Sequence, residues 1–157
     1  MAKREPVSPA VPEPVAPGYD EDFYAWTQST AALLRAGRFS DVDVAHVAEE
    51  VEDMGKRDRR ELDSRLQVLL VHLLKWQLQA DRRSPSWNAT VVTQRAGIEA
   101  LLRDSPSLGP RVASELARNY RVAVERVAAE TGLAADILPA TCPWSPAQLL
   151  DRSFLPA

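Results

Sequence analysis

One nearly continuous run of apolar residues lies near the middle of the chain. From Leu66 to Leu74, seven of nine residues are Leu or Val, and the exceptions are Gln67 and His72. A helix that is apolar on almost every side belongs in the interior of a helical bundle. We therefore predict a central helix from about residue 58 to about residue 79, against which the other elements pack. The run is about half the roughly 20 residues that a bilayer requires, so we do not interpret it as a membrane span.

Two shorter helices are predicted before the central one. Asp20 is a candidate N-cap for the first, because its carboxylate can accept hydrogen bonds from the free amides of the first turn. Gly37 supplies the left-handed stop that commonly ends a helix. The second helix follows a cap at Asp41 or Asp43 and ends at Gly55. We expect this glycine to separate the second helix from the central one.

Two further helices and a short last one follow. A Ser-Pro pair at 84–85 combines a cap with a first-turn proline and predicts a fourth helix. The segment 104–110, rich in Pro, Gly and Ser, ends that helix. Apolar positions at helical spacing predict a fifth helix that stops at Gly132, and a second Ser-Pro pair at 145–146 opens the last one. No stretch alternates with the period of two that strands require, so we predict an all-α fold, a single-domain bundle of about five helices.

The N-terminal segment differs from the rest of the chain in composition. Residues 1–18 hold five of the twelve prolines, interleaved with Ala, Val and Glu. Such a segment has too few large apolar groups to offset the entropy lost on ordering. We therefore predict a disordered Pro-rich tail at 1–18 and one helical domain at 19–157, a size that suits a single core.

Charge is distributed unevenly along the chain, although the net charge is only −3. Residues 1–55 carry 4 basic and 11 acidic side chains, whereas residues 56–126 carry 14 basic and 8 acidic ones. Two interpretations follow from this asymmetry. Either the basic middle binds an anionic partner, or the acidic first third folds against it.

Cysteine usage and the N-terminus predict a cytoplasmic protein. The single cysteine, Cys142, cannot form an internal disulfide, which suits a reducing compartment. The N-terminal segment contains Lys3 and Arg4 but lacks the apolar core of a secretory signal. Neither a phosphate-binding glycine loop nor an activated-cysteine signature is present in the sequence.

The two histidines suggest a metal site as one hypothesis. If the second and central helices pack antiparallel across Gly55, His46, Glu50 and His72 can approach one another, with Glu52 as a further candidate. These nitrogen and oxygen ligands suit zinc or iron. The structural alternative is that His72 is hydrogen-bonded to a neighbour at the edge of the core and that His46 is exposed. The Glu-x-x-His repeat of carboxylate-bridged di-iron bundles is absent from the sequence.

A basic strip suggests an anionic partner as another hypothesis. Lys56, Arg57, Arg59 and Arg60 open the predicted central helix and could hold a phosphate backbone. Acidic residues interrupt the strip, and the sequence pI of about 5.4 lies far below that of a typical nucleic-acid-binding domain.

Five stretches in the same order resemble a bacterial domain-of-unknown-function family, number twenty-nine. They are YDEDFYAW at 19–26, EEVEDMG at 49–55, LLVHLLKW at 69–76, RDSPSL at 103–108 and CPWS at 142–145. The resemblance covers about residues 18–156 and implies an all-α bacterial domain with no established activity, substrate or cofactor. No catalytic residue can be carried over. Among the matching positions, Glu50, Glu52, His72 and Lys75 are polar groups beside apolar ones, and they require partners where they are buried.

These observations favour binding over catalysis. We expect a cytoplasmic module that binds another protein, with no membrane association and with an oligomeric state that the sequence leaves open. Two alternatives stay open. One is a metal-dependent hydrolase or oxidoreductase that uses His72 with Glu50 or Glu52, and the other is association with nucleic acid through the basic strip.

Overall fold

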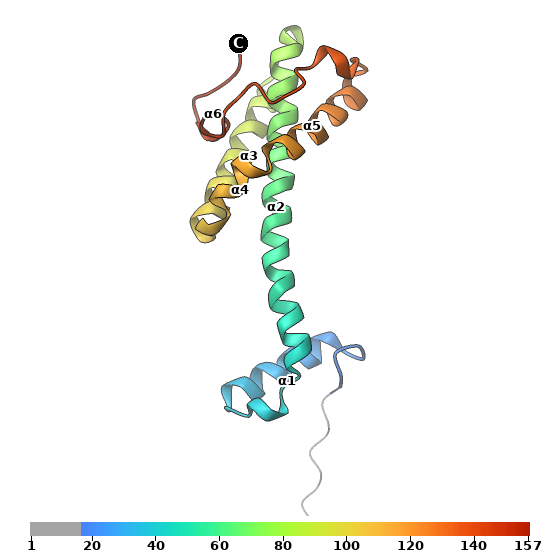
Figure 1. Cartoon of the computed structure of the whole chain (residues 1–157), viewed down its shortest axis with the longest axis vertical. Coiled ribbons are helices and arrows are strands. Elements are labelled where there is room, and N and C mark those ends of the chain that lie inside the picture. Colours follow the sequence, from blue (N-terminus) through green and yellow to red (C-terminus); the bar gives the residue numbers. More distant parts are fainter. Residues whose placement is uncertain (1–16) are drawn as a thin grey trace, which may run out of the picture. The chain divides into compact units, whose positions relative to one another are not determined.

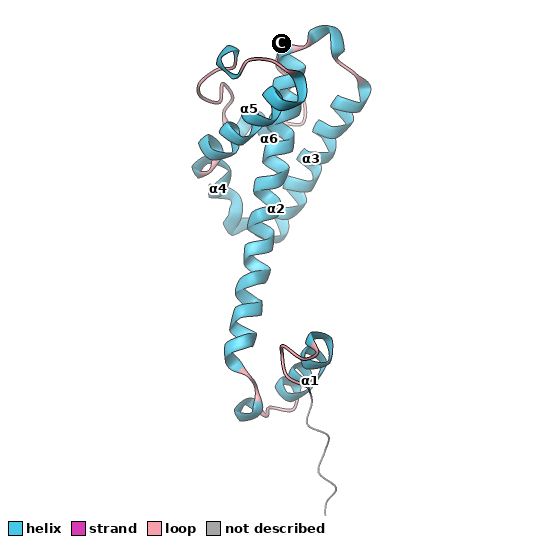
Figure 2. Ribbon diagram, turned by 90° about the vertical axis from the view of Figure 1, so that its right-hand side faces the viewer, coloured by secondary structure: helices cyan, strands magenta, loops and turns pink. Residues whose placement is uncertain are grey.

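The computed structural model describes residues 17–157, and the described chain is helical without strands (Figure 2). The all-α prediction is therefore confirmed. The predicted tail lies almost wholly outside the described residues. The helices are α1 (Phe23–Arg35), α2 (Val44–Leu78), α3 (Pro85–Asp104), α4 (Gly109–Ser114), α5 (Leu116–Thr131) and α6 (Pro146–Leu150). Short 3-10 turns lie between them: η1 (Phe39–Asp41), η2 (Ala80–Arg82), η3 (Pro106–Leu108) and η4 (Ala135–Ile137).

The described chain packs as two compact units. The first ends at Glu52 and contains α1, η1 and the start of α2. The second runs from Asp53 to Ala157 and contains the rest of α2 with all later elements. The expectation of one domain over residues 19–157 stays a prediction.

The helix boundary predicted at Gly55 is wrong. A single helix, α2, continues through this position from Val44 to Leu78. A glycine inside a helix costs only about 0.5–1 kcal/mol relative to alanine. The Lys, Arg and Glu residues near this position are good helix formers. Two ion pairs also lie on the helix itself: Lys56 with Asp53 at 2.8 Å, and Arg65 with Glu61 at 2.7 Å. Within residues 17–157, no helix combines the length and apolar character needed to cross a membrane.

The first helix begins later than predicted. Asp22, not Asp20, is its N-cap, because the Asp22 carboxylate accepts a hydrogen bond from the Ala25 amide at 2.9 Å. Asp20 lies instead in the preceding turn, which closes through hydrogen bonds to the carbonyl oxygen of Gly18. The stop at Gly37 is confirmed, since this residue has a φ of 71°.

The later cap predictions are confirmed, but the predicted fifth helix is two helices. Ser84 caps α3, and Ser145 forms a reciprocal capping box with Gln148 at the start of α6. The predicted fifth helix is divided into α4 and α5, because the backbone at Glu115 leaves the helical region with φ −99° and ψ 2°. Gly132 ends α5 in the left-handed conformation, with a φ of 72°.

The core of the second unit surrounds the apolar part of α2. Figures 1 and 2 both show α3, α4, α5 and α6 gathered around this part of the helix. Seven residues of α2 are completely buried: Leu62, Leu66, Leu69, Leu70, Val71, Leu73 and Leu74. Their buried partners come from every later helix and the loop before α6: Val91, Ile98, Val112, Tyr120, Ala123, Val127, Leu138, Trp144 and Leu149. The prediction of a central helix is thus confirmed, although the helix is longer than expected.

Hydrogen bonds set the directions of the helices that flank α2. Arg65 contacts Gln94 and Asp58 contacts the Ser105 hydroxyl, so α3 runs antiparallel to α2. Gln67 contacts Asn119 on α5, and Lys75 contacts Glu130 farther along both helices. Helix α5 therefore runs in the same general direction as α2 and supplies polar partners to one side of it.

Shortening a buried α2 side chain tests this core. Leu70→Ala should lower the free energy of unfolding by about 2–5 kcal/mol, because it removes buried methyl groups and leaves a cavity that the neighbours fill incompletely. Urea denaturation followed by circular dichroism measures the change. Met54→Ala is the matched control on the same helix, since Met54 is 61% exposed and its truncation should change stability by less than about 0.5 kcal/mol. Equal losses in the two variants would contradict a core centred on α2.

Candidate functional site

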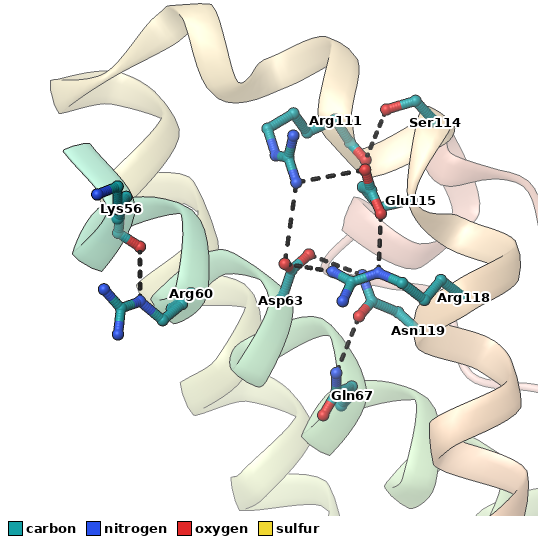
Figure 3. Close-up of polar contacts among 9 residues, drawn as sticks. All are labelled: Lys56, Arg60, Asp63, Gln67, Arg111, Ser114, Glu115, Arg118 and Asn119. Carbon is teal, nitrogen blue, oxygen red and sulfur yellow. Dashed lines mark hydrogen bonds and ion pairs between the residues drawn. The ribbon is translucent and has the colours of Figure 1, made fainter. Parts of the chain in front are cut away.

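An arginine-rich pocket lies in the second unit where α2 faces α4 and α5 (Figure 3). It has a volume of about 340 Å³. Its lining residues are Arg59, Arg60 and Asp63 from α2, Arg111 from α4, Arg118 from α5, and Glu115 between these two helices. We call it the Asp63 pocket.

Asp63 joins the pocket to a buried polar chain. Its Oδ2 accepts a hydrogen bond from Nη2 of Arg118 at 2.5 Å, and its Oδ1 accepts one from Nδ2 of Asn119 at 3.0 Å. The Asn119 amide oxygen accepts in turn from Nε2 of Gln67 at 2.9 Å. Asn119 is completely buried, so these two bonds offset the cost of removing its amide from water. They also hold the Asp63 carboxylate in a defined orientation.

Glu115 holds the two arginines at the α4–α5 junction. Its carboxylate lies 3.3 Å from Nη2 of Arg111 and accepts from Nε of Arg118 at 2.8 Å. The hydrogen bond from Arg118 to Asp63, together with the one to Glu115, raises the pKa of the Arg118 guanidinium. The Nε atom of Arg111 is buried and has no hydrogen-bond partner among residues 17–157.

The predicted basic strip contributes two of its four members to this pocket. Arg60 is steadied by a hydrogen bond from its Nε to the carbonyl oxygen of Lys56 at 3.2 Å (Figure 3). Arg59 lines the pocket and has no hydrogen-bond or ion-pair partner within the described residues. Lys56 contacts Asp53, and Arg57 is exposed; neither lines the pocket.

Sequence reasoning missed Arg111, Glu115 and Arg118. The i, i+4 spacing of Arg111 and Glu115 and the i, i+3 spacing of Glu115 and Arg118 were the available signal, since such pairs meet on one side of a regular helix. This spacing does not indicate which other helix the three side chains face. Arg118 is 55 residues from Asp63 in the sequence, so only the packing of α5 against α2 brings them together.

The first unit places His46 and Glu50 around Tyr19. The Tyr19 hydroxyl donates a hydrogen bond to Oε1 of Glu50 at 2.6 Å, and this bond is the main reason that the pKa of Tyr19 rises to about 12. The Tyr19 ring stacks on the His46 ring with 4.1 Å between centroids. His46 also contacts Asp43, with 2.5 Å from Nδ1 to Oδ2. Trp26 also belongs to this aromatic cluster. The contacts of Tyr19 with His46 and Glu50 join the segment before α1 to the start of α2.

The other two candidate metal ligands, Glu52 and His72, belong to different units and differ in burial. Glu52 is an exposed residue of the first unit, whereas His72 belongs to the second and is partly buried. Nδ1 of His72 lies 2.8 Å from the carbonyl oxygen of Val68 in the same helix. The antiparallel return at Gly55, on which the site of His46, Glu50 and His72 depended, is not formed. No three His, Cys, Asp or Glu side chains of residues 17–157 are grouped so that they could hold a metal ion. The metal site stays a prediction.

Lys75 and Cys142 are both partly buried. The Lys75 ammonium lies 3.1 Å from Oε2 of Glu130 and 4.8 Å from the centre of the Trp87 ring. This combination of an ion pair and a cation–π contact compensates the partial burial of the charge. Burial raises the pKa of the Cys142 thiol, which opposes the thiolate form that a nucleophile requires.

Removing the charge of Asp63 tests the pocket as a folded unit. Asp63→Asn should lower the free energy of unfolding by about 1–3 kcal/mol, because it weakens a charge-assisted hydrogen bond to Arg118 and leaves donors partly unsatisfied. Urea denaturation measures this loss. Asp104→Asn provides a control, since Asp104 is exposed and lies 3.9 Å from Arg103, and exposed pairs contribute little. A loss no greater than that of the control would show that Asp63 does not organise the pocket.

The His46–Asp43 contact makes a prediction about pH. Its hydrogen bond raises the pKa of His46 and lowers that of Asp43. The stabilisation through His46 is complete below the ordinary histidine pKa of about 6.5 and is lost as pH rises through the higher folded-state value. An NMR titration should give a His46 midpoint above the ordinary histidine pKa of about 6.5, and Asp43→Asn should lower it. Asp41→Asn is the control and should leave it unchanged; an unshifted midpoint in the unmodified protein would contradict the contact.

Comparison with known proteins identifies a family but no activity. No curated protein matches the chain, and no solved structure matches it. A family model described as "Domain of unknown function DUF29" matches residues 19–155. The match spans all the helices described above and agrees with the five sequence stretches that indicated the same family. The chain therefore belongs to the DUF29 family, a domain family of unknown function.

Proposed function

We propose that the protein is an interaction module whose second unit binds an acidic segment of a partner protein in the Asp63 pocket. One observation carries this proposal. Four arginines line the pocket, Arg59, Arg60, Arg111 and Arg118, against only two carboxylates. The pocket therefore has an excess of positive charge and the volume to admit side chains of another molecule.

Unused donors in the pocket support binding of carboxylates. Asp63 and Glu115 engage Arg111 and Arg118, while Arg59 and Arg60 form no ion pair with a carboxylate of the described residues. A guanidinium presents donors in a planar fork that matches a carboxylate through two parallel hydrogen bonds. An Asp or Glu side chain of a partner would pair with Arg59 or Arg60.

The charge arrangement favours protein over nucleic acid. Asp63 and Glu115 lie inside the pocket, where they would repel a phosphate backbone that carries negative charge at every step. A protein segment can present both signs of charge and so match the pocket, with acidic side chains on the arginines and a basic one near Glu115. The low overall pI of about 5.4 points the same way.

The lining of the pocket suits binding rather than proton transfer. An arginine side chain stays protonated under physiological conditions, so it cannot serve as a general base. The two carboxylates are already held by arginines at 2.5–3.9 Å. We propose the cytoplasm as the compartment, since the chain carries a single cysteine and cannot form an internal disulfide.

Affinity capture with charge variants tests the proposal. The tagged protein should recover a partner protein from lysate of its own host after nuclease treatment. Arg59→Gln combined with Arg60→Gln should reduce this recovery at least about tenfold, because hydrogen bonds to charged groups contribute about 1.5–3 kcal/mol each. Quantitative mass spectrometry measures recovery.

A charge-matched control separates the pocket from general electrostatics. Arg82→Gln combined with Arg103→Gln removes two exposed arginines that do not line the pocket, and it should retain the partner. Loss of the partner after nuclease would favour nucleic-acid association instead. Equal recovery by the pocket variant and the unmodified protein, or no recovery by either, would contradict the proposed function.

A further inference from the structure

A second arginine site lies elsewhere in the second unit, where α3 faces the chain around α6. Arg95 of α3 is only 4% exposed, although it carries a charge. Its Nε donates a hydrogen bond to the carbonyl oxygen of Leu149 at 2.8 Å. Its Nη2 is buried and has no hydrogen-bond partner among the described residues. Buried donors without a partner are rare in folded proteins because they forfeit their hydration without replacement.

A small cavity adjoins the Arg95 side chain. It has a volume of about 110 Å³ and is lined by Arg95 and Arg152 together with the apolar side chains of Val92 and Ala96. Such a volume exceeds what one water molecule occupies, so the cavity can take a group of several non-hydrogen atoms. Arg152 is an exposed side chain that also contacts Glu99. The cavity thus combines one buried cation, one cation at the surface and an apolar wall.

The neighbouring carboxylates do not neutralise Arg95 by direct contact. Asp151 is close enough to favour the charged form of Arg95, but its Oδ1 accepts hydrogen bonds from the Ser153 amide at 2.8 Å and hydroxyl at 2.7 Å. Glu99 pairs with Arg152. Burial lowers the pKa of the Arg95 guanidinium, which reflects the cost of holding this charge away from water.

We propose that the cavity binds the carboxylate of a small aliphatic acid, or of a longer molecule that ends in one. The carboxylate supplies the missing acceptor for Arg95 and a second contact for Arg152. The aliphatic stem lies against Val92 and Ala96, whose apolar surface offers nothing to a fully hydrated anion such as phosphate. This site shares no lining residue with the Asp63 pocket, so it stands independently of the proposed function.

Titration of the full-length protein with propionate tests the site. Propionate, in place of chloride at equal ionic strength, should saturably shift the NMR signals of the Arg95 side chain and of the Val92 methyl groups. Phosphate should not produce these shifts. Ala96→Leu fills the cavity while keeping both arginines and should abolish the effect. Thr93→Leu is the matched control on an exposed position of α3 and should leave it intact.

Removing the charge of Arg152 should weaken propionate binding without abolishing it. Arg152→Gln should weaken propionate binding about tenfold, because one charge-assisted hydrogen bond is lost. Arg103→Gln, which removes an exposed charge outside the cavity, should not weaken it. The proposal is overturned if propionate acts no differently from chloride, which would mean that water alone satisfies Arg95. It is equally overturned if Ala96→Leu binds as tightly as the unmodified protein.

Discussion

Burial of the apolar part of α2 is the constraint on which the second unit depends. Residues 62–74 of this helix include seven side chains with no exposed surface. One neighbouring helix can cover only part of a helix circumference, so several must pack on it together. Helices α3, α4, α5 and α6 each contribute buried side chains to this task. The arrangement of both candidate binding sites follows, because each lies where a covering element meets another helix at the edge of this core.

The polar chain through Asn119 shows how the Asp63 pocket is built on that core. Asp63 lies beside the buried Leu62, and Gln67 lies beside the buried Leu66. One stripe of α2 is therefore polar and partly buried, and the completely buried Asn119 of α5 links its two members. A buried amide with satisfied partners fixes the position of one helix against another more strictly than apolar packing does. The charged rim of the pocket is thus attached to a rigid base.

The two arginine sites share a chemistry but differ in what they can accept. The Asp63 pocket contains both signs of charge and opens to a volume of about 340 Å³, which suits the mixed surface of a protein segment. The Arg95 cavity is smaller, about 110 Å³, and largely apolar, which suits a single carboxylate. Both contain an arginine nitrogen that is buried without a partner in the described chain. This shared feature, rather than net charge, distinguishes them from the exposed arginines of the surface.

Local patterns in the sequence were enough to predict the helical class, the family, the central apolar run and most helix ends. The Ser-Pro starts and the stops at Gly37 and Gly132 are such patterns. The helix boundary predicted at Gly55 was wrong, because neighbouring ion pairs and good helix formers outweigh the modest cost of a glycine. The contact between Arg118 and Asp63, which are 55 residues apart, depends instead on the packing of α5 against α2. The periodicity of a helix records which side a residue occupies, whereas the partner on that side depends on how separate helices pack.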